Sequence, residues 1–180
     1  MNIQHRAELP KLLKHLNLPL IGIELGVAEG HNSYDLLENG LEKLYSVDAW
    51  MTLSQKGDGS SSQEWHSKNY NVAVNKLSKF GESSIILKGL SNEMAAYIPD
   101  ESVGLLYLDG DHSYKGVMND LKNYYSKVVE GGIVAGHDFI NPAYGVKEAV
   151  YDFVAGRFEV HIIPENSPEN ASFYFIKKTI

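Results

Sequence analysis

Two apolar stretches of this sequence end in acidic and imidazole side chains. The first, LYLDGDHSY (106–114), runs from apolar residues directly into Asp109, Asp111 and His112. The second, GGIVAGHDF (131–139), ends in the same way at His137 and Asp138. Imidazole and carboxylate groups move protons near neutral pH and also bind metal ions, so these two segments are the first candidates for a reactive site.

The sequence around these segments alternates between strand-like and helix-like patterns. Short apolar runs typical of strands buried on both faces lie at 20–25, 44–49, 84–89, 103–109 and 132–139. Apolar residues recur at helical spacing in 8–16 and in 145–154. After Ser113, the same spacing links Val117, Leu121, Tyr124 and Val128. This alternation predicts βαβ units and an α/β fold with a doubly wound, mostly parallel sheet.

The C-terminal part of the chain breaks the alternation. Residues 158–163 and 173–176 have strand patterns, and the connector between them (PENSPENAS) is too short and turn-rich to hold a crossover helix. We therefore expect these two strands to pair antiparallel, which predicts a seven-stranded sheet with a terminal antiparallel hairpin. The carboxyl ends of neighbouring parallel strands meet at one edge, so adjacent fourth and fifth strands would bring the acids and histidines together.

Length and composition limit the remaining possibilities. A chain of 180 residues favours one domain, 1–180, with a helical extension at 1–18 and a Gly- and Ser-rich segment at 53–63 that acts as a flexible connector or a lid. The net charge is −7 without a basic stripe, which argues against a nucleic-acid partner and favours a small molecule or another protein. No apolar run is long enough to cross a bilayer, no cysteine is present and no leader pattern is found, so we expect a cytoplasmic protein.

A glycine turn follows the first predicted strand in GIELGVAEGHNS (22–33). Gly26 and Gly30 allow the backbone to turn tightly and to approach a ligand, and the helix that opens near 31–33 offers free N–H groups. Asp48 ends the second strand, where a carboxylate accepts hydrogen bonds from ribose hydroxyls in doubly wound folds. The spacing is G-x-x-x-G, so the three-glycine dinucleotide fingerprint is not met. These features predict a site for a nucleoside cofactor.

Five motifs at these strand ends together resemble the class I S-adenosylmethionine-dependent methyltransferases: IELGVAEGHNS, YSVDAW, GLSNE, LYLDGDHSY and GGIVAGHDF. The likeness is greatest to the small O-methyltransferase-like branch with D-x-DHSY and GGxxxxHD motifs, and it spans nearly the whole chain. It implies a Rossmann-like fold with a terminal hairpin. It also implies methyl transfer from S-adenosylmethionine, with an oxygen atom of a small molecule as the acceptor.

The resemblance also implies where the cofactor lies. Its methionine and ribose part would be lined by Glu24, Gly26, Ala28 and Gly30. Asp48 would hold the ribose hydroxyls, and Asp109 would lie beside the reactive sulfonium. The adenine would be bordered by Ala49, Trp50, Leu90 and Ser91.

Three chemistries remain open for the acids and histidines at the strand ends. In the first, methyl transfer proceeds without metal: the site aligns the reacting atoms, and His112 or His137 takes the proton of an oxygen nucleophile. In the second, Asp109 and Asp138 bind a divalent ion. Related catechol-type methyltransferases use two acids and an amide there, whereas this chain has His137 in place of an acid, and histidine suits Mg²⁺ poorly.

The third chemistry is non-haem iron held by the two histidines and a carboxylate, which would leave the glycine turn and Asp48 without a role. Asp111 and Ser113 have a simpler alternative role as caps of the following helix. Two other functions also remain open, an NAD-dependent oxidoreductase and a catalytically silent nucleoside-binding interaction module. The sequence does not indicate an oligomeric state.

Overall fold

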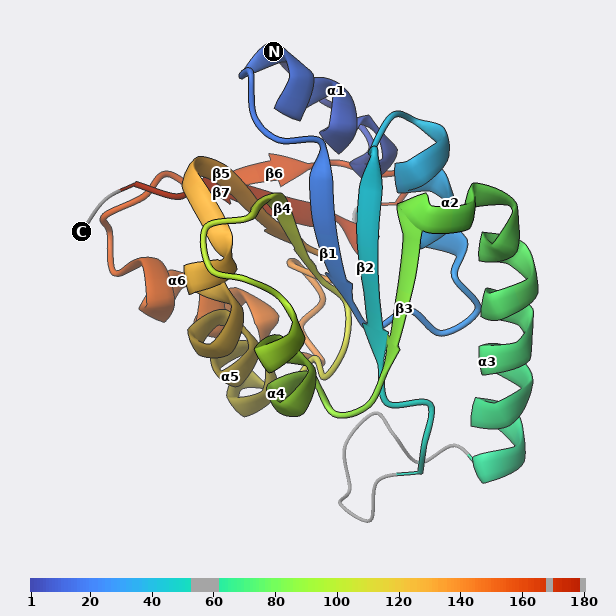
Figure 1. Ribbon diagram of the computed structural model, residues 1–180. Helices are drawn as coiled ribbons and strands as arrows, with labels where there is room; N and C mark the ends of the chain where they lie inside the picture. Colours follow the sequence, from blue (N-terminus) through green and yellow to red (C-terminus); the bar gives the residue numbers. More distant parts are fainter. Residues whose placement is uncertain (53–61, 168–169, 179–180) are drawn as a thin grey trace.

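A seven-stranded sheet forms the centre of the computed structural model, which describes residues 1–52, 62–167 and 170–178 (Figure 1). The strand order is β3-β2-β1-β4-β5-β7-β6. The strands are β1 (Ile21–Leu25), β2 (Lys43–Asp48), β3 (Ser84–Lys88), β4 (Val103–Leu108), β5 (Val128–Gly136), β6 (His161–Ile163) and β7 (Ser172–Ile176).

Helices cover both faces of this sheet (Figure 1). The α-helices are α1 (Leu9–His15), α2 (His31–Glu38), α3 (Gln63–Leu77), α4 (Ser91–Met94), α5 (Tyr114–Tyr124) and α6 (Val146–Val154). Short 3₁₀ turns are η1 (Arg6–Glu8), η2 (Ser78–Ser83), η3 (Ala95–Tyr97) and η4 (Tyr125–Lys127). Among the described residues, no helix is long and apolar enough to cross a membrane.

The predicted topology is confirmed. Strands β3, β2, β1, β4 and β5 pair in parallel, and β7 pairs antiparallel with both β5 and β6. The register places Leu25 of β1 opposite Leu108 of β4, and Leu108 opposite Gly136 of β5. Because these three strands end level with one another, the residues that follow them emerge at the same edge of the sheet.

Alternate residues of β4 divide the core into two layers. Leu106 and Leu108 pack into a cluster with residues of α5 and α6, while Leu105 and Tyr107 pack into a second cluster with residues of α1 and α2. This burial on both faces explains why the strand reads as a continuous apolar run. We call the two sides of the sheet the α5–α6 face and the α1–α2 face.

Most predicted element boundaries shift by a residue or two, and larger differences occur at Val128 and in the predicted strand 158–163. Val128, which was assigned to the helical stripe after Ser113, is the first residue of β5. Helix α5 ends at Tyr124, and η4 turns the chain before β5 begins. Val128 still packs in the same apolar cluster as α5, so its spacing correctly indicated burial but not its backbone conformation. The predicted strand at 158–163 is shorter, because only His161–Ile163 pairs with β7.

The polar segment predicted as a flexible connector or a lid, 53–63, lies mostly outside the described residues. Its last two residues belong to the start of α3: Ser62 is the N-cap and accepts a hydrogen bond from Trp65 N, and Gln63 begins the helix. In the N-terminal extension, 1–18, Ile3 and two residues of α1, Leu9 and Leu13, pack in the apolar cluster on the α1–α2 face.

A buried acid, Glu24 of β1, holds the start of α2 against the sheet. Its carboxyl group, which is 1% exposed, accepts a hydrogen bond from Asn32 Nδ2 at 3.0 Å and another from Ser33 Oγ. Ser33 Oγ also lies 2.9 Å from Ser46 Oγ of β2. Burial, partly offset by the hydrogen bonds from Ser33 and Asn32, raises the pKa of Glu24 to about 8.

Replacing Glu24 with Gln should therefore flatten the dependence of stability on pH. The ordinary pKa is 4.5, so between pH 4.5 and about pH 8 the folded chain keeps a proton that the unfolded chain has lost. The stability contributed by Glu24 is fully present below that range and is lost as the pH rises through it, by at most about 1.4 kcal/mol per pH unit. Urea unfolding at pH 5, 6, 7 and 8 should show the wild type weakening relative to Glu24→Gln. Parallel curves for the two proteins would contradict this assignment.

Candidate functional site

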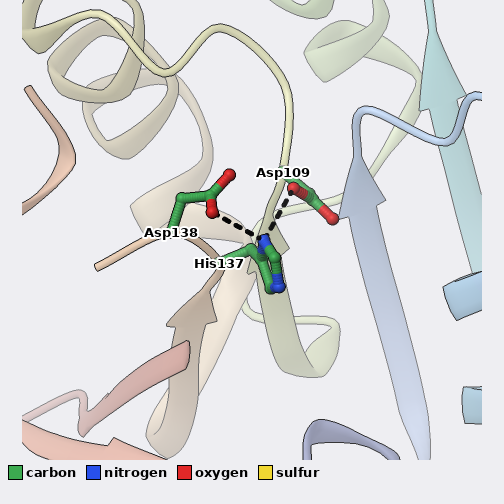
Figure 2. A group of neighbouring side chains, drawn as sticks. All are labelled: Asp109, His137 and Asp138. Atoms are coloured by element: carbon green, nitrogen blue, oxygen red, sulfur yellow. Dashed lines mark ion pairs between the residues drawn. The ribbon is translucent and has the colours of Figure 1, made fainter. Parts of the chain in front are cut away.

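The structure brings the four predicted catalytic side chains together at the level edge of β1, β4 and β5. His112 Nε2 lies 3.3 Å from Asp109 Oδ1 and 3.4 Å from Asp138 Oδ2. His137 Nδ1 lies 3.3 Å from Asp138 Oδ1 and 3.8 Å from Asp109 Oδ1 (Figure 2). The four side chains are 13–23% exposed, so solvent reaches this cluster but does not surround it. We call these four residues the strand-end cluster.

The backbone around the strand-end cluster is fixed by extensions of the sheet. Asp109 N donates to Leu25 O at 2.7 Å, and His137 N donates to Leu108 O at 3.0 Å, so each residue continues the hydrogen bonding of the strand before it. Asp138 then adopts a left-handed backbone conformation with φ of 52°, and the next residue, Phe139, donates its N–H to Ala171 O at 2.9 Å. The backbones of Asp109 and His137 are therefore held directly by the sheet.

His112 has an aromatic neighbour that sequence reasoning missed. The ring of Tyr144 stacks on the imidazole, with the ring centres 4.8 Å apart and an angle of 27° between the planes. His112 O accepts a hydrogen bond from Gly145 N at 2.9 Å, which fixes the segment after β5 against the segment after β4. The only sequence signal for Tyr144 was its position in the loop that follows the GGxxxxHD motif.

Positive charges stabilise the ionised form of Asp138. Burial raises the pKa of this carboxyl, but a hydrogen bond from His137 and the charges of His137, His112 and Arg6 outweigh the burial and lower it below the ordinary value. Asp138 is therefore an anion at neutral pH. Arg6, which comes from the N-terminal extension, was not predicted as a site residue, and no motif pointed to it.

Hydrogen bonding also orients the imidazole of His137. Its Nδ1 faces both carboxylates, whereas the other ring nitrogen, Nε2, is turned away from them (Figure 2). With Nδ1 donating to Asp138, the neutral ring carries its lone pair on Nε2. The ring is thus arranged so that Nε2 can accept a proton.

Three members of the strand-end cluster are close enough to share a metal ion. One ligand atom from each of Asp109, His137 and Asp138 lies within 4.8 Å of the others (Figure 2). Asp109 and Asp138 were the predicted metal ligands, and the structure adds His137 to them. A donor set of one imidazole and two carboxylates fits Mn²⁺, Fe²⁺ or Zn²⁺ better than Mg²⁺, which prefers oxygen alone.

The glycine turn lies directly against the strand-end cluster. Gly26 has φ of +86°, and a Cβ atom there would lie 2.0 Å from the backbone oxygen of Asp109, so only glycine fits. Gly30, also in the left-handed region, is the N-cap residue of α2, and Ala28 between them has φ of 47°. The turn and the cluster therefore share a backbone contact.

Asp48 organises this turn through its carboxylate. Oδ2 accepts hydrogen bonds from Val27 N and Ala28 N, each at 2.9 Å, and Oδ1 accepts one from Trp50 N at 2.7 Å. A carboxylate has about four acceptor positions, so Oδ1 retains one for a ligand hydroxyl. The predicted ribose acid is thus placed at the turn, where it also holds the turn in shape.

Of the two predicted adenine neighbours after β2, Trp50 is 1% exposed, whereas Ala49 is half-buried. The indole of Trp50 packs with Val27 and Ala73, and its Nε1 donates to Ala28 O at 2.9 Å. The ring therefore lies beneath the turn and supports it. In this structure, Ala49 is the more accessible of the pair.

Leu90 and Ser91, the other predicted adenine neighbours, mark the start of α4 as its N-cap and first residue. Ser91 Oγ donates to Asp120 Oδ1 at 2.6 Å, and Ser91 O accepts from Tyr124 OH at 2.6 Å. Burial raises the pKa of Asp120 to about 6, although the hydrogen bond from Ser91 opposes the shift. Asp120, a buried acid on α5, was missed because it occupies an ordinary helical position in the sequence.

Asp111 and Ser113 cap the start of α5. Ser113 is the N-cap residue and accepts from Gly116 N at 3.1 Å, while Asp111 Oδ1 accepts from Ser113 N at 2.9 Å. Their side chains are committed to the beginning of this helix. Of the acids and histidines that follow β4, Asp109 and His112 are the two that join the strand-end cluster.

The comparisons with known proteins agree with this geometry. A family model described as a methyltransferase domain matches residues 22–139, which contain the glycine turn and the whole strand-end cluster. A protein described as uncharacterized protein R132, from Acanthamoeba polyphaga mimivirus, is 26% identical over 147 residues. That match covers 76% of this chain and 62% of the viral protein, so the chain spans less than two thirds of that relative.

Two solved structures show the same fold. An O-methyltransferase from Bacillus cereus in complex with SAH is 11% identical, with a TM-score of 0.67 over 96% of this chain and 80% of that one. The O-methyltransferase NovP is 19% identical, with a TM-score of 0.69 over 97% of this chain and 78% of that one. Because the family model covers more than half of the chain, the chain belongs to the methyltransferase domain family, and its resemblance to class I S-adenosylmethionine-dependent methyltransferases is confirmed.

Proposed function

We propose that this protein transfers the methyl group of S-adenosylmethionine to an oxygen atom of a small molecule. The observation that carries the proposal is the backbone contact between Gly26 and Asp109, which places the glycine turn beside the strand-end cluster. A cofactor held by the turn would present its reactive end to acid–base groups. Methyl transfer needs this juxtaposition, because donor, carbon and acceptor must be aligned.

The turn supplies the contacts that a nucleoside with an amino-acid tail requires. The free N–H groups at the start of α2 and the remaining acceptor position of Asp48 Oδ1 suit polar groups of the ligand. Ala49, Leu90 and Ser91 would border the adenine, and Glu24 would act from below by holding α2. The similar O-methyltransferase from Bacillus cereus was solved with SAH, which supports this choice of cofactor.

The strand-end cluster supplies the means to remove the acceptor's proton. His137 Nε2 would take the proton from the acceptor hydroxyl, while Asp138 holds the ring orientation and stabilises the imidazolium that forms. Asp109 and His112 would complete the polar wall of the site. A metal held by Asp109, His137 and Asp138 would, when bound, lower the pKa of the acceptor hydroxyl instead.

Calorimetric titration of the metal-stripped protein with S-adenosylhomocysteine, and separately with NAD, tests the cofactor assignment. Saturable binding of S-adenosylhomocysteine with no heat from NAD is expected. Binding of NAD alone would replace the proposal with an oxidoreductase. Tight binding of S-adenosylhomocysteine with no methyl transfer to any hydroxyl acceptor would instead favour a silent nucleoside-binding module.

Asp48→Ala should weaken S-adenosylhomocysteine binding, because the variant loses the ribose contact and the three N–H bonds that hold the turn. The expected loss is about 1–3 kcal/mol of binding free energy, measured by calorimetry. Glu42→Ala is the matched control, since Glu42 is an exposed acid just before β2, at the opposite edge of the sheet. Equal affinities for the two folded variants would remove Asp48 from the cofactor site.

The strand-end cluster should bind Mn²⁺ more tightly than Mg²⁺, because one of its three ligands is an imidazole. Asp138→Asn should weaken Mn²⁺ binding by at least about tenfold, whereas Asp111→Asn, which alters a neighbouring acid that caps α5, should not. Preference for Mg²⁺, or equal loss in both variants, would exclude this ligand set.

A further inference from the structure

The N-terminal segment, residues 3–8, is fastened near the strand-end cluster by one buried acid. Glu165, in the connector after β6, accepts from Arg6 N through Oε1 at 3.0 Å, and its Oε2 lies 3.1 Å from His5 Nε2. Its own N–H donates to Gln4 O at 3.1 Å. The Glu165 side chain is 5% exposed. Both carboxylate oxygens are thus occupied in holding the segment, and none of these contacts uses the guanidinium of Arg6.

The guanidinium of Arg6 instead reaches inward, toward the carboxyl ends of the strands. Its Nε atom is buried and has no hydrogen-bond partner among the described residues. Burial lowers the pKa of Arg6, but the negative charges of Asp109 and Glu165 and a hydrogen bond with Tyr107 outweigh it, so the group remains a cation. Its charge also acts on Asp138, the residue after His137.

Arg6 is the permanent cation of this region. Of the three residues whose positive charge acts on Asp138, the other two are histidines, whose charge depends on pH. Burying a guanidinium is unfavourable unless its N–H groups find partners, and one of them has none in the described residues. The planar fork of an arginine binds a carboxylate through two parallel hydrogen bonds. These features suit an anionic group of a ligand.

The position of Arg6 assigns it to the cofactor side of the site. Tyr107, its neighbour, faces the α1–α2 face, and Glu24, on which the charge of Arg6 also acts, binds α2 below the glycine turn. Tyr144, which stacks on His112, packs instead against the α5–α6 face. Arg6 therefore lies on the α1–α2 face of the sheet, the face on which the glycine turn leads into α2.

We propose that Arg6 binds the carboxylate of the cofactor's methionine moiety. This inference rests on the proposed function, in which the tail of the cofactor passes over the turn toward Asp109. The tail has a positive ammonium and a positive sulfonium, which Asp109 matches, and one carboxylate, which needs a cation. Arg6 provides that cation from the N-terminal segment that Glu165 holds in place.

The test compares S-adenosylhomocysteine with its decarboxylated analogue, S-adenosyl-3-thiopropylamine, by calorimetry on the full chain. The wild type should bind S-adenosylhomocysteine about ten- to a hundredfold more tightly, because only this ligand offers Arg6 a carboxylate. Arg6→Gln should remove most of this preference and leave the affinity for the analogue within about twofold. Lys11→Gln, which removes an exposed positive charge from α1, should keep the wild-type preference.

Two results would overturn the inference and spare the proposed function. The first is wild type that binds both ligands equally, which requires no variant and so does not depend on how Arg6→Gln folds. The second is an equal loss of both ligands in Arg6→Gln, which would make Arg6 a purely structural anchor. Arg6→Lys, which keeps the charge without the fork, should retain an intermediate preference. Wild type that binds neither compound would instead overturn the proposed function itself.

Discussion

The contact between Gly26 and the backbone of Asp109 is the constraint on which the rest of the site depends. Gly26 N donates to Val47 O and Asp109 N donates to Leu25 O, so the first residues after β1 and β4 extend the sheet and meet there. Any side chain at Gly26 would push these two segments apart. The glycine turn and the strand-end cluster can be neighbours only because this position has no Cβ.

The carboxyl groups around this contact have three different surroundings. The surroundings of each carboxyl group determine its role. Glu24 is buried beside neutral hydrogen-bond donors and keeps its proton, so its role is to hold α2 against the sheet. Asp48 accepts hydrogen bonds from backbone N–H groups and retains an acceptor position for a hydroxyl. Asp109 and Asp138 lie beside imidazoles and a guanidinium, so they can stabilise an imidazole that gains a proton during a reaction.

Much of this arrangement could be predicted from the sequence, because it depends on local patterns. The alternation of apolar runs and helical stripes predicted the sheet. Because neighbouring parallel strands end at the same edge, it also predicted that Asp109 and His137 lie close together. Val128 was misassigned because burial at helical spacing is compatible with a strand that starts there. Trp50 shows a similar limit: the family resemblance implied that it borders the adenine, but its burial beneath the turn depends on packing with Val27 and Ala73, which are distant along the chain.

The contacts that could not be predicted are those made by single side chains over long sequence separations. Arg6 and Glu165 meet across 159 positions, and no periodicity or motif links them. Their pairing holds the N-terminal segment, which packs on the α1–α2 face, whereas Tyr144 packs on the α5–α6 face. Charged side chains and backbone groups would then line the cofactor side of the site, and an aromatic ring would line the acceptor side. In such a site the N-terminal segment would set affinity for the common cofactor, and the loop after β5, which carries Tyr144 and the exposed Ile140, would set the choice of acceptor.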